Sequence, residues 1–140
     1  MEPGRRGQRG QAIMEMAVVL PLLALLVAAS LAFGPLVYLQ LAVQQVSYDC
    51  ALASAQSLDP AQGYLQGVYA AERSLEGFNL NRARAEVSLR GSWERGGAVL
   101  CSVDYRVPTG AFPFHGVIEL PARMSHAVTL PVQAGKSVWQ

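Results

Sequence analysis

One stretch of the sequence decides the fold: residues 16–48, MAVVLPLLALLVAASLAFGPLVYLQLAVQQVSY, contain no Asp, Glu, Lys or Arg. The whole chain has 140 residues, of which 51% are hydrophobic and 15% are charged. Average soluble proteins have about a quarter of their residues charged. As a helix the stretch would be about 50 Å long, whereas a bilayer core needs only about 20 apolar residues. The stretch is therefore typical of a helix that spans a membrane and continues beyond it.

The two halves of this stretch differ in polarity. Ala17 to Phe33 is apolar, which predicts the membrane-spanning half. From Leu36 to Ser54, apolar residues recur at helical spacing with glutamines and serines between them, which predicts an amphipathic half that packs on a soluble domain. These apolar positions are Leu39, Val43, Val46, Cys50 and Ala53. Pro21 and Gly34-Pro35 predict bends in one long helix or, alternatively, a break between two helices at Gly34-Pro35.

A basic leader precedes the stretch, and no comparable basic cluster follows it. The leader arginines are Arg5, Arg6 and Arg9. The positive-inside rule then predicts a cytoplasmic N-terminus and an external C-terminal part. We expect a cytoplasmic leader at residues 1–10, a transmembrane helix at 11–35 that spans the membrane in a single pass, and an extracytoplasmic α+β domain at 36–140.

Glu15 lies at the entrance to the apolar stretch, five residues after the Gly10 that ends the leader. A carboxylate at membrane depth is costly unless it is paired, and such residues often mark a functional site. The alternative is a solvated carboxylate at the level of the lipid headgroups.

The segment 5–21, RRGQRGQAIMEMAVVLP, resembles the class III signal of type IV pilins, and more closely the head of the TadE-like minor pilins of tight-adherence (Tad) pili. Phe33-Gly34, Tyr38 and an Ala- and Gln-rich continuation extend the resemblance over about residues 5–55. The chain departs from the family in its tandem Arg-Gly-Gln groups and in Met16, where many relatives have an aromatic residue. Of the two tandem glycines, only Gly10 has a glutamate at the required spacing.

The resemblance implies that a prepilin peptidase cuts between Gly10 and Gln11. A glycine lets an extended backbone enter a tight cleft. The new α-amino group of Gln11 would then pair with Glu15 of a neighbouring subunit, which offsets the cost of both charges and sets the axial register. The implied function is that of a minor pilin or pseudopilin in pilus assembly and surface adhesion. The implied partners are the peptidase, other pilin and minor pilin subunits, the inner-membrane assembly machinery and membrane lipid.

The C-terminal part predicts a short helix and about three antiparallel strands in a pilin-like arrangement. Asp59-Pro60 begins the helix, which runs to about Leu75 with Gly77 as its C-cap. Its apolar residues at helical spacing are Leu65, Val68 and Tyr69. Period-two alternation predicts strands near 84–93, 99–107 and 117–130, a turn at 94–97, a loop at 108–116 and a frayed tail from 133.

Cys50 lies on the apolar face of the predicted long helix, and Cys101 lies on the apolar face of the second strand. The two facings are inferred independently, and they bring both sulfur atoms to one interface. We therefore predict a Cys50–Cys101 disulfide that closes a loop of about 50 residues and contributes about 2–4 kcal/mol. The alternative is a pair of unpaired buried thiols.

Several function classes are disfavoured by composition. A formal net charge of +1 argues against a nucleic-acid binder, and two cysteines are too few for a four-cysteine zinc site. His115 and Glu119 have metal-ligand spacing, but the Gly and Pro residues around them exclude a helix, and His126 is expected to be a satisfied core histidine. We expect no enzyme activity, catalytic residue, metal or cofactor.

Two other interpretations stay open. A cleavable secretory signal would give a mature chain that begins near Ser30 or Phe33. A simple single-pass envelope protein with a small partner-binding domain would keep Met1.

Overall fold

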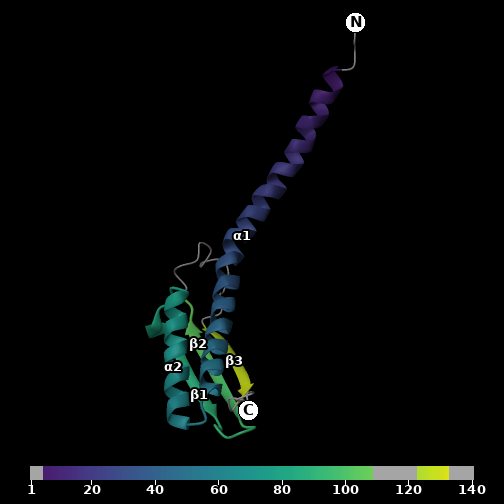
Figure 1. Ribbon diagram of the computed structural model, residues 1–140. Helices are drawn as coiled ribbons and strands as arrows, with labels where there is room; N and C mark the ends of the chain where they lie inside the picture. The colour runs from purple at the N-terminus through teal and green to yellow at the C-terminus, as the bar shows by residue number, and fades with distance from the viewer. Residues whose placement is uncertain (1–4, 109–122, 133–140) are drawn as a thin grey trace. The chain divides into compact units, whose positions relative to one another are not determined.

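The computed structural model of this protein describes residues 5–108 and 123–132. Its elements are α1 (Arg5–Ala55), α2 (Pro60–Gly77), the 3-10 turn η1 (Arg82–Arg84), β1 (Ala85–Gly91), β2 (Ala98–Arg106) and β3 (Arg123–Pro131) (Figure 1). The chain divides into two units, Met1–Val37 and Tyr38–Gln140, and the division falls inside α1. The predicted α+β class is confirmed.

α1 is one helix of 51 residues that continues through Pro21 and Pro35. The alternative of two helices that meet at Gly34-Pro35 is therefore wrong. A proline removes one backbone donor from a helix, but the surrounding residues are mostly Leu and Ala, which have high helix propensity. In lipid a backbone has no partner other than its own helix, which favours continuity further.

The sheet has the order β1-β2-β3, and both pairs of strands are antiparallel. Central strand β2 shows the predicted alternation most clearly, with its inward residues buried and Leu100 exposed. The inward residues are Val99, Cys101, Val103 and Tyr105. β1 and β3 alternate between half-buried and exposed residues, which is typical of edge strands.

The connections between the strands agree with the prediction where the structure describes them. Gly97 donates its N–H to the carbonyl of Glu94 at 2.8 Å, and Gly96 has a φ of 82°, which favours glycine. The predicted turn between β1 and β2 is confirmed. The predicted loop from residue 109, the first part of the predicted third strand up to residue 122, and the tail from 133 lie outside the described residues.

Both ends of α2 have identifiable caps. Asp59 is the N-cap as predicted, and its Oδ1 accepts the N–H of Ala61 at 3.2 Å. The predicted C-cap is wrong: Gly77 is the last helical residue and Phe78 is the cap. The left-handed residue is Asn79, with φ of 55°, because an Asn side chain tolerates this conformation.

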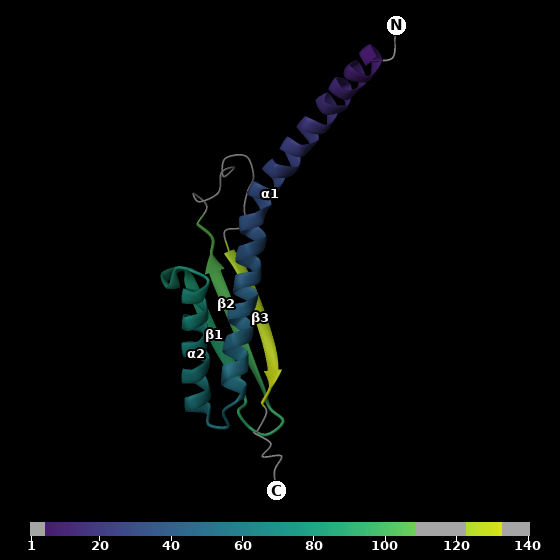
Figure 2. The same cartoon turned by 45° about the horizontal axis from the view of Figure 1, so that its top comes forward.

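The core of the second unit lies between the last part of α1 and the sheet. Figures 1 and 2 show α1 and α2 side by side on one face of the three strands. The predicted amphipathic face of α1 is confirmed by Leu39, Val43, Val46 and Cys50, which are 6% exposed or less. The opposite face of the sheet carries the exposed polar residues of the strands.

Candidate membrane anchor and subunit-docking site

The first half of α1 presents apolar side chains all around the helix. Between Ile13 and Phe33, the large apolar side chains have exposed fractions from 50% at Val19 to 73% at Met14. Such a surface is unfavourable in water and favourable in lipid. The hydroxyl of Ser30 donates to the carbonyl of Leu26 at 2.9 Å, so this polar group is satisfied inside the helix. α1 is long and apolar enough to cross a membrane.

Glu15 lies at the start of this apolar surface. Its side chain is exposed, and the adjacent Met14 and Met16 are 73% and 66% exposed. Gly10 precedes Glu15 on the same helix by about 7.5 Å along the axis, at the rise of an α-helix. The carboxylate therefore lies on the exposed surface of an otherwise apolar helix segment.

The predicted cleavage site belongs to the first turns of α1, which begins at Arg5. The backbone of Gly10 and Gln11 is helical, and the same holds for the leader arginines Arg5, Arg6 and Arg9. The structure does not describe the side chains of residues 5–12. A protease that requires an extended backbone would therefore have to unwind the beginning of this helix.

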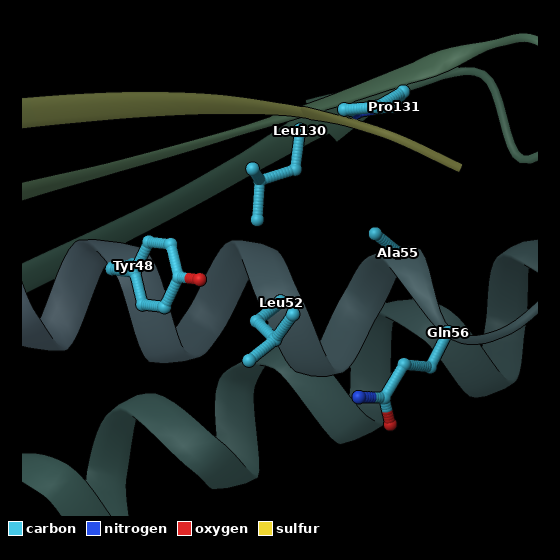
Figure 3. A pocket seen from close by; sticks show the side chains of 6 residues that line it. All are labelled: Tyr48, Leu52, Ala55, Gln56, Leu130 and Pro131. Atoms are coloured by element: carbon cyan, nitrogen blue, oxygen red, sulfur yellow. The ribbon is translucent and has the colours of Figure 1, made fainter. Parts of the chain in front are cut away.

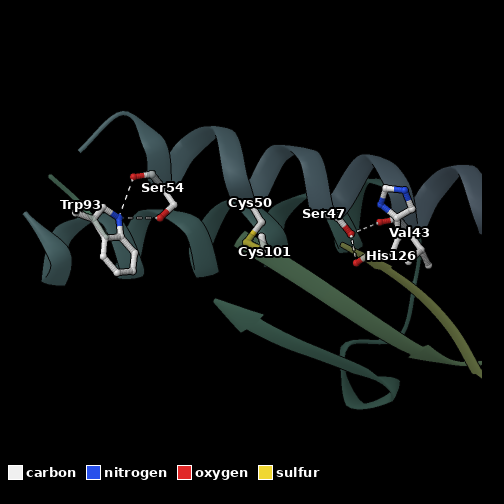
Figure 4. The surroundings of a disulfide bond; sticks show 7 residues. All are labelled: Val43, Ser47, Cys50, Ser54, Trp93, Cys101 and His126. Carbon is white, nitrogen blue, oxygen red and sulfur yellow. Dashed lines mark hydrogen bonds between the residues drawn. A yellow bond between two sulfur atoms is a disulfide. The ribbon is translucent and has the colours of Figure 1, made fainter. Parts of the chain in front are cut away.

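The two cysteines lie in the core of the second unit. The structure joins Cys50 of α1 to Cys101 of β2 as a disulfide, with the Sγ atoms 2.06 Å apart and the Cα atoms 6.2 Å apart (Figure 4). Both residues are fully buried. The structure thus has the predicted pairing and not the alternative of two thiols. The bond fastens the last part of α1 to the central strand of the sheet.

Polar contacts flank the disulfide along α1, as Figure 4 shows. On one side, the buried hydroxyl of Ser47 lies 2.9 Å from the carbonyl of Val43 and 3.1 Å from that of His126. On the other side, the indole Nε1 of Trp93 lies 3.1 Å from the hydroxyl of Ser54 and 3.2 Å from its carbonyl. Three points of attachment therefore fix this part of α1 to the sheet and to the segment that follows β1.

His126 lies half-buried on β3, on the predicted apolar face. Its Nδ1 is buried and has no hydrogen-bond partner among the described residues. The expectation of a fully satisfied histidine is therefore wrong for this atom. The hydroxyl of Ser47 on α1 bonds to the carbonyl oxygen of His126 and not to its ring.

Small residues position α2 against α1, a feature that the sequence prediction missed. The buried residues of α2 are Gly63, Gly67, Ala71 and Leu75. A Cβ atom on Gly67 would lie 3.0 Å from Cβ of Ser54 and 3.2 Å from the carbonyl oxygen of Cys50. The backbones approach closely because Gly63, Gly67 and Ala71 have little or no side chain.

A polar contact also joins α1 and α2. The carboxylate of Asp49 on α1 accepts a hydrogen bond from Ser74 of α2 at 2.7 Å and another from Gln45 at 2.8 Å. Asp49 is the first charged residue after the uncharged stretch. In the sequence, only the position of Asp49 directly after the uncharged stretch pointed to this contact. Ser74 has no distinctive pattern around it.

The close approach turns larger apolar residues of α2 outward. Leu65 and Tyr69, which the helical spacing assigned to an apolar face, are 68% and 65% exposed. Tyr64 and Leu58 are each 47% exposed. We name Leu58, Tyr64, Leu65 and Tyr69 the α2 apolar patch. No charged residue occurs from Pro60 to Ala71, so the patch has the composition of a protein interface more than that of an ordinary solvated helix face.

Residues 5–108 and 123–132 contain no group of three or more His, Cys, Asp or Glu residues that could hold a metal ion. His115 and Glu119, which have metal-ligand spacing in the sequence, lie outside these residues.

A protein-family model described as TadE-like protein matches residues 10–52. The match begins at the glycine of the predicted cleavage site and ends just after Cys50, so the resemblance stated from the sequence is confirmed for this segment. No curated protein and no solved structure matches the chain.

Proposed function

Because residues 10–52 of this chain are TadE-like, which associates the protein with Tad pili, we propose that it is a minor pilin or pseudopilin of such a system. In this proposal a prepilin peptidase removes residues 1–10, and the mature subunit takes part in pilus assembly and surface adhesion. One observation carries the proposal: a continuous helix joins an exposed apolar segment, headed by Glu15, to a folded domain.

The apolar half of α1 holds the subunit in the cytoplasmic membrane before assembly. Its exposed Leu, Val, Ile and Met side chains are stable in lipid, and they are equally stable against the apolar helices of other subunits. The same surface can therefore serve as a membrane anchor and later as a helix-bundle interface. The leader arginines keep the N-terminus on the cytoplasmic side and the domain outside.

Glu15 gives this apolar interface a defined register. Ordinary apolar packing between two helices tolerates axial shifts, whereas a carboxylate in an apolar bundle must meet a cation. Removal of residues 1–10 creates a cation at the α-amino group of Gln11, four residues before Glu15. Pairing of that amine with Glu15 of an adjoining subunit would fix one axial offset.

The α2 apolar patch supports contacts of the outer domain with other pilin subunits. Its four side chains are 47–68% exposed. Leu58 lies just before α2, and the other three lie on this helix, whose first three turns have no charge. We assign adhesion and subunit contact to this domain, and assembly to α1. The inner-membrane assembly machinery and the peptidase complete the set of proposed partners.

The position of the family match favours this function over a cleavable secretory signal. The match spans the positions where a signal peptidase would cut, near Ser30 and Phe33, and continues into the core residues of α1. A chain that is not cut near Ser30 or Phe33 keeps its apolar helix, as a membrane-anchored subunit would.

Processing of the full-length protein in its native host tests the proposal directly. Mass spectrometry of the purified protein is expected to show a mature chain that begins at Gln11. Gly10→Leu is expected to reduce cleavage by more than about tenfold, since a bulky side chain costs more than about 1.4 kcal/mol in a tight cleft. Gly7→Leu is the matched control, because Gly7 has the same Arg-Gly-Gln context without a glutamate five residues later, and it should be cleaved normally. A native chain that starts at Met1, Ser30 or Phe33 would contradict the proposal.

A further inference from the structure

The last part of α1 carries an apolar stripe on the side that faces away from the sheet. We name it the α1 outer stripe, and it consists of Tyr38, Leu41, Gln45, Tyr48 and Leu52. Its four apolar side chains are 40–59% exposed, and Gln45 is exposed as well. The residues follow each other at intervals of three or four, which keeps them along one side of a helix and is the spacing of a coiled-coil seam. Val43 and Cys50 lie on the opposite side of the helix and are buried.

Contacts within the molecule hold the side chains of the stripe in position. The ring of Tyr38 packs edge-on against that of Phe78, with the ring centroids 6.3 Å apart, and its hydroxyl lies 3.4 Å from the carbonyl oxygen of Phe78. Tyr48 and Leu52 border a pocket of about 180 Å³, into which Leu130 points from β3 (Figure 3). Side chains that are already positioned lose little freedom when a partner covers them.

The surface around the stripe is uncharged. An open hollow of about 510 Å³ runs along Tyr38, Leu41 and Tyr48, and it shares Tyr48 with the pocket in Figure 3. None of the residues that line these two hollows is Asp, Glu, Lys or Arg. An exposed apolar surface without charge is unfavourable in water and is typical of a site that another apolar surface covers.

We propose that a second copy of this protein covers the stripe, so that two copies pack their outer stripes against each other as a parallel pair of helices. The inference rests on the membrane anchor of the proposed function. Two copies anchored in one membrane have their N-termini on the same side, and each has the same number of residues between the anchor and Tyr38. The two stripes therefore lie at the same height, where one stripe can meet the other around a two-fold axis.

Gln45 gives this contact a defined register. Its amide Nε2 donates to Oδ1 of Asp49 at 2.8 Å, and Oδ2 of Asp49 accepts the hydroxyl of Ser74 at 2.7 Å, so both oxygens of this carboxylate are bonded within their own molecule. In the parallel pair the two Gln45 side chains lie opposite each other, and each offers an amide oxygen and an amide hydrogen to the other. One polar pair in an apolar seam is satisfied only when the two helices are in register.

The size of the stripe assigns the contact to the membrane. A stable interface between soluble proteins buries about 800 Å² on each partner, which is more than five side chains of this exposure supply. Copies in one membrane are already oriented and move in two dimensions, so their association costs less translational and rotational freedom. The proposed pair therefore forms between anchored subunits.

Cysteine crosslinking of the full-length protein in its native membranes tests the inference. Both native cysteines are buried in their own disulfide, so an introduced cysteine is the free thiol of the chain. With a copper–phenanthroline oxidant, Leu41→Cys is expected to give at least about tenfold more covalent dimer than Gln40→Cys, because a disulfide needs Cα atoms within about 7 Å. Gln40 is the matched control, since it is exposed on α1 but lies about 100° away from Leu41 around the helix.

A charge at the end of the stripe tests which face of the domain makes the contact. Leu52→Glu, combined with Leu41→Cys, is expected to reduce the covalent dimer by more than about tenfold, because two like charges would face each other. Leu65→Glu in the α2 apolar patch is the matched control, since Leu65 is 68% exposed and lies outside the stripe, and it should leave the dimer in place. Gly10→Leu should also leave the dimer in place, because the contact depends on the anchor and not on cleavage.

Four results would overturn the inference. Equal crosslinking of Leu41→Cys and Gln40→Cys would exclude a contact through the stripe. Crosslinking of Leu41→Cys in one copy with Val27→Cys in another, but not with Leu41→Cys itself, would assign the stripe to the apolar segment of a shifted copy. Crosslinking that requires removal of residues 133–140 would show that the chain's own end covers the stripe. Loss of the dimer in Gly10→Leu would assign the contact to assembled pili.

Discussion

Glu15 carries a charge, whereas its neighbours on the helix are apolar. The side chains around it are apolar and highly exposed, so in the assembled state they must lie in lipid or against other helices. A single carboxylate in such surroundings is stable only when a cation is close to it. In the proposed assembly, Glu15 would therefore favour the one arrangement of neighbouring helices that brings a cation to it, and disfavour the others.

Glu15→Ala removes the carboxylate but keeps the helix, since Ala has the highest helix propensity. Cleavage after Gly10 should continue at nearly the normal rate, whereas incorporation into pili should fall by more than about tenfold, because removal of one partner of a buried ion pair costs about 3–5 kcal/mol. The measurement is quantification of surface pili and of the subunit in sheared pili.

Glu15→Asp is the matched control for this variant, since it keeps the charge and shortens the side chain. Pilus formation should be partly restored in Glu15→Asp. Normal piliation of the Glu15→Ala strain would refute the docking role, and loss of cleavage in that strain would assign Glu15 to recognition by the peptidase.

At the scale of elements, the packing of α2 on α1 depends on small residues in place of large ones. Gly67 faces Ser54 and the carbonyl of Cys50 at distances that leave no room for a larger side chain. Gly77, at the C-terminal end of α2, has no atom within 4 Å of the position where a Cβ would lie. The two glycines therefore form a natural pair for comparison.

Gly67→Val is expected to lower the free energy of unfolding by about 1–3 kcal/mol, because overpacking forces the two helices apart. Gly77→Ala should be neutral, or stabilising by up to about 1 kcal/mol, because Ala has the higher helix propensity and meets no clash. Urea unfolding of the full-length protein, followed by circular dichroism, measures both. Equal stability of Gly67→Val and the wild type would show that α2 does not pack on α1 through this face.

The elements also show which features the sequence could predict. α1 and the three strands were predictable, because long uncharged stretches and period-two alternation are strong patterns. The Cys50–Cys101 pair was predictable, because each cysteine lies within a clear apolar pattern on its own element. The buried face of α2 was not, because its residues are mainly Gly and Ala, which carry little hydrophobic signal, while the more apolar Leu65 and Tyr69 lie outside. The C-cap was missed because Asn79 takes the left-handed conformation that a glycine was expected to take.

At the scale of the whole molecule, the disulfide is the covalent link between α1 and the sheet. Replacement of both cysteines by alanine is expected to lower the free energy of unfolding of the domain by about 2–4 kcal/mol. The apolar half of α1 should keep its helicity in detergent, since its backbone hydrogen bonds are internal. Denaturant unfolding with tryptophan fluorescence reports the domain, because Trp93 contacts Ser54 near the end of α1.

Reduction of the wild-type protein with a thiol reductant should reproduce the effect of the double substitution. The double variant itself should be insensitive to the reductant, which makes it the control for side effects of the reagent. A stability change below about 0.5 kcal/mol in both experiments would show that the bond contributes little to this fold.

The continuity of α1 has a mechanical consequence. In the proposed function, a force that draws the apolar part of the helix out of the bilayer would act along the same helix that packs on the sheet. That load passes from the helix into β2 at Cys50 and Cys101, through a covalent bond that does not yield as non-covalent packing does. If the protein is the proposed pilin subunit, this bond would keep α1 attached to the sheet while the helix is drawn out of the membrane.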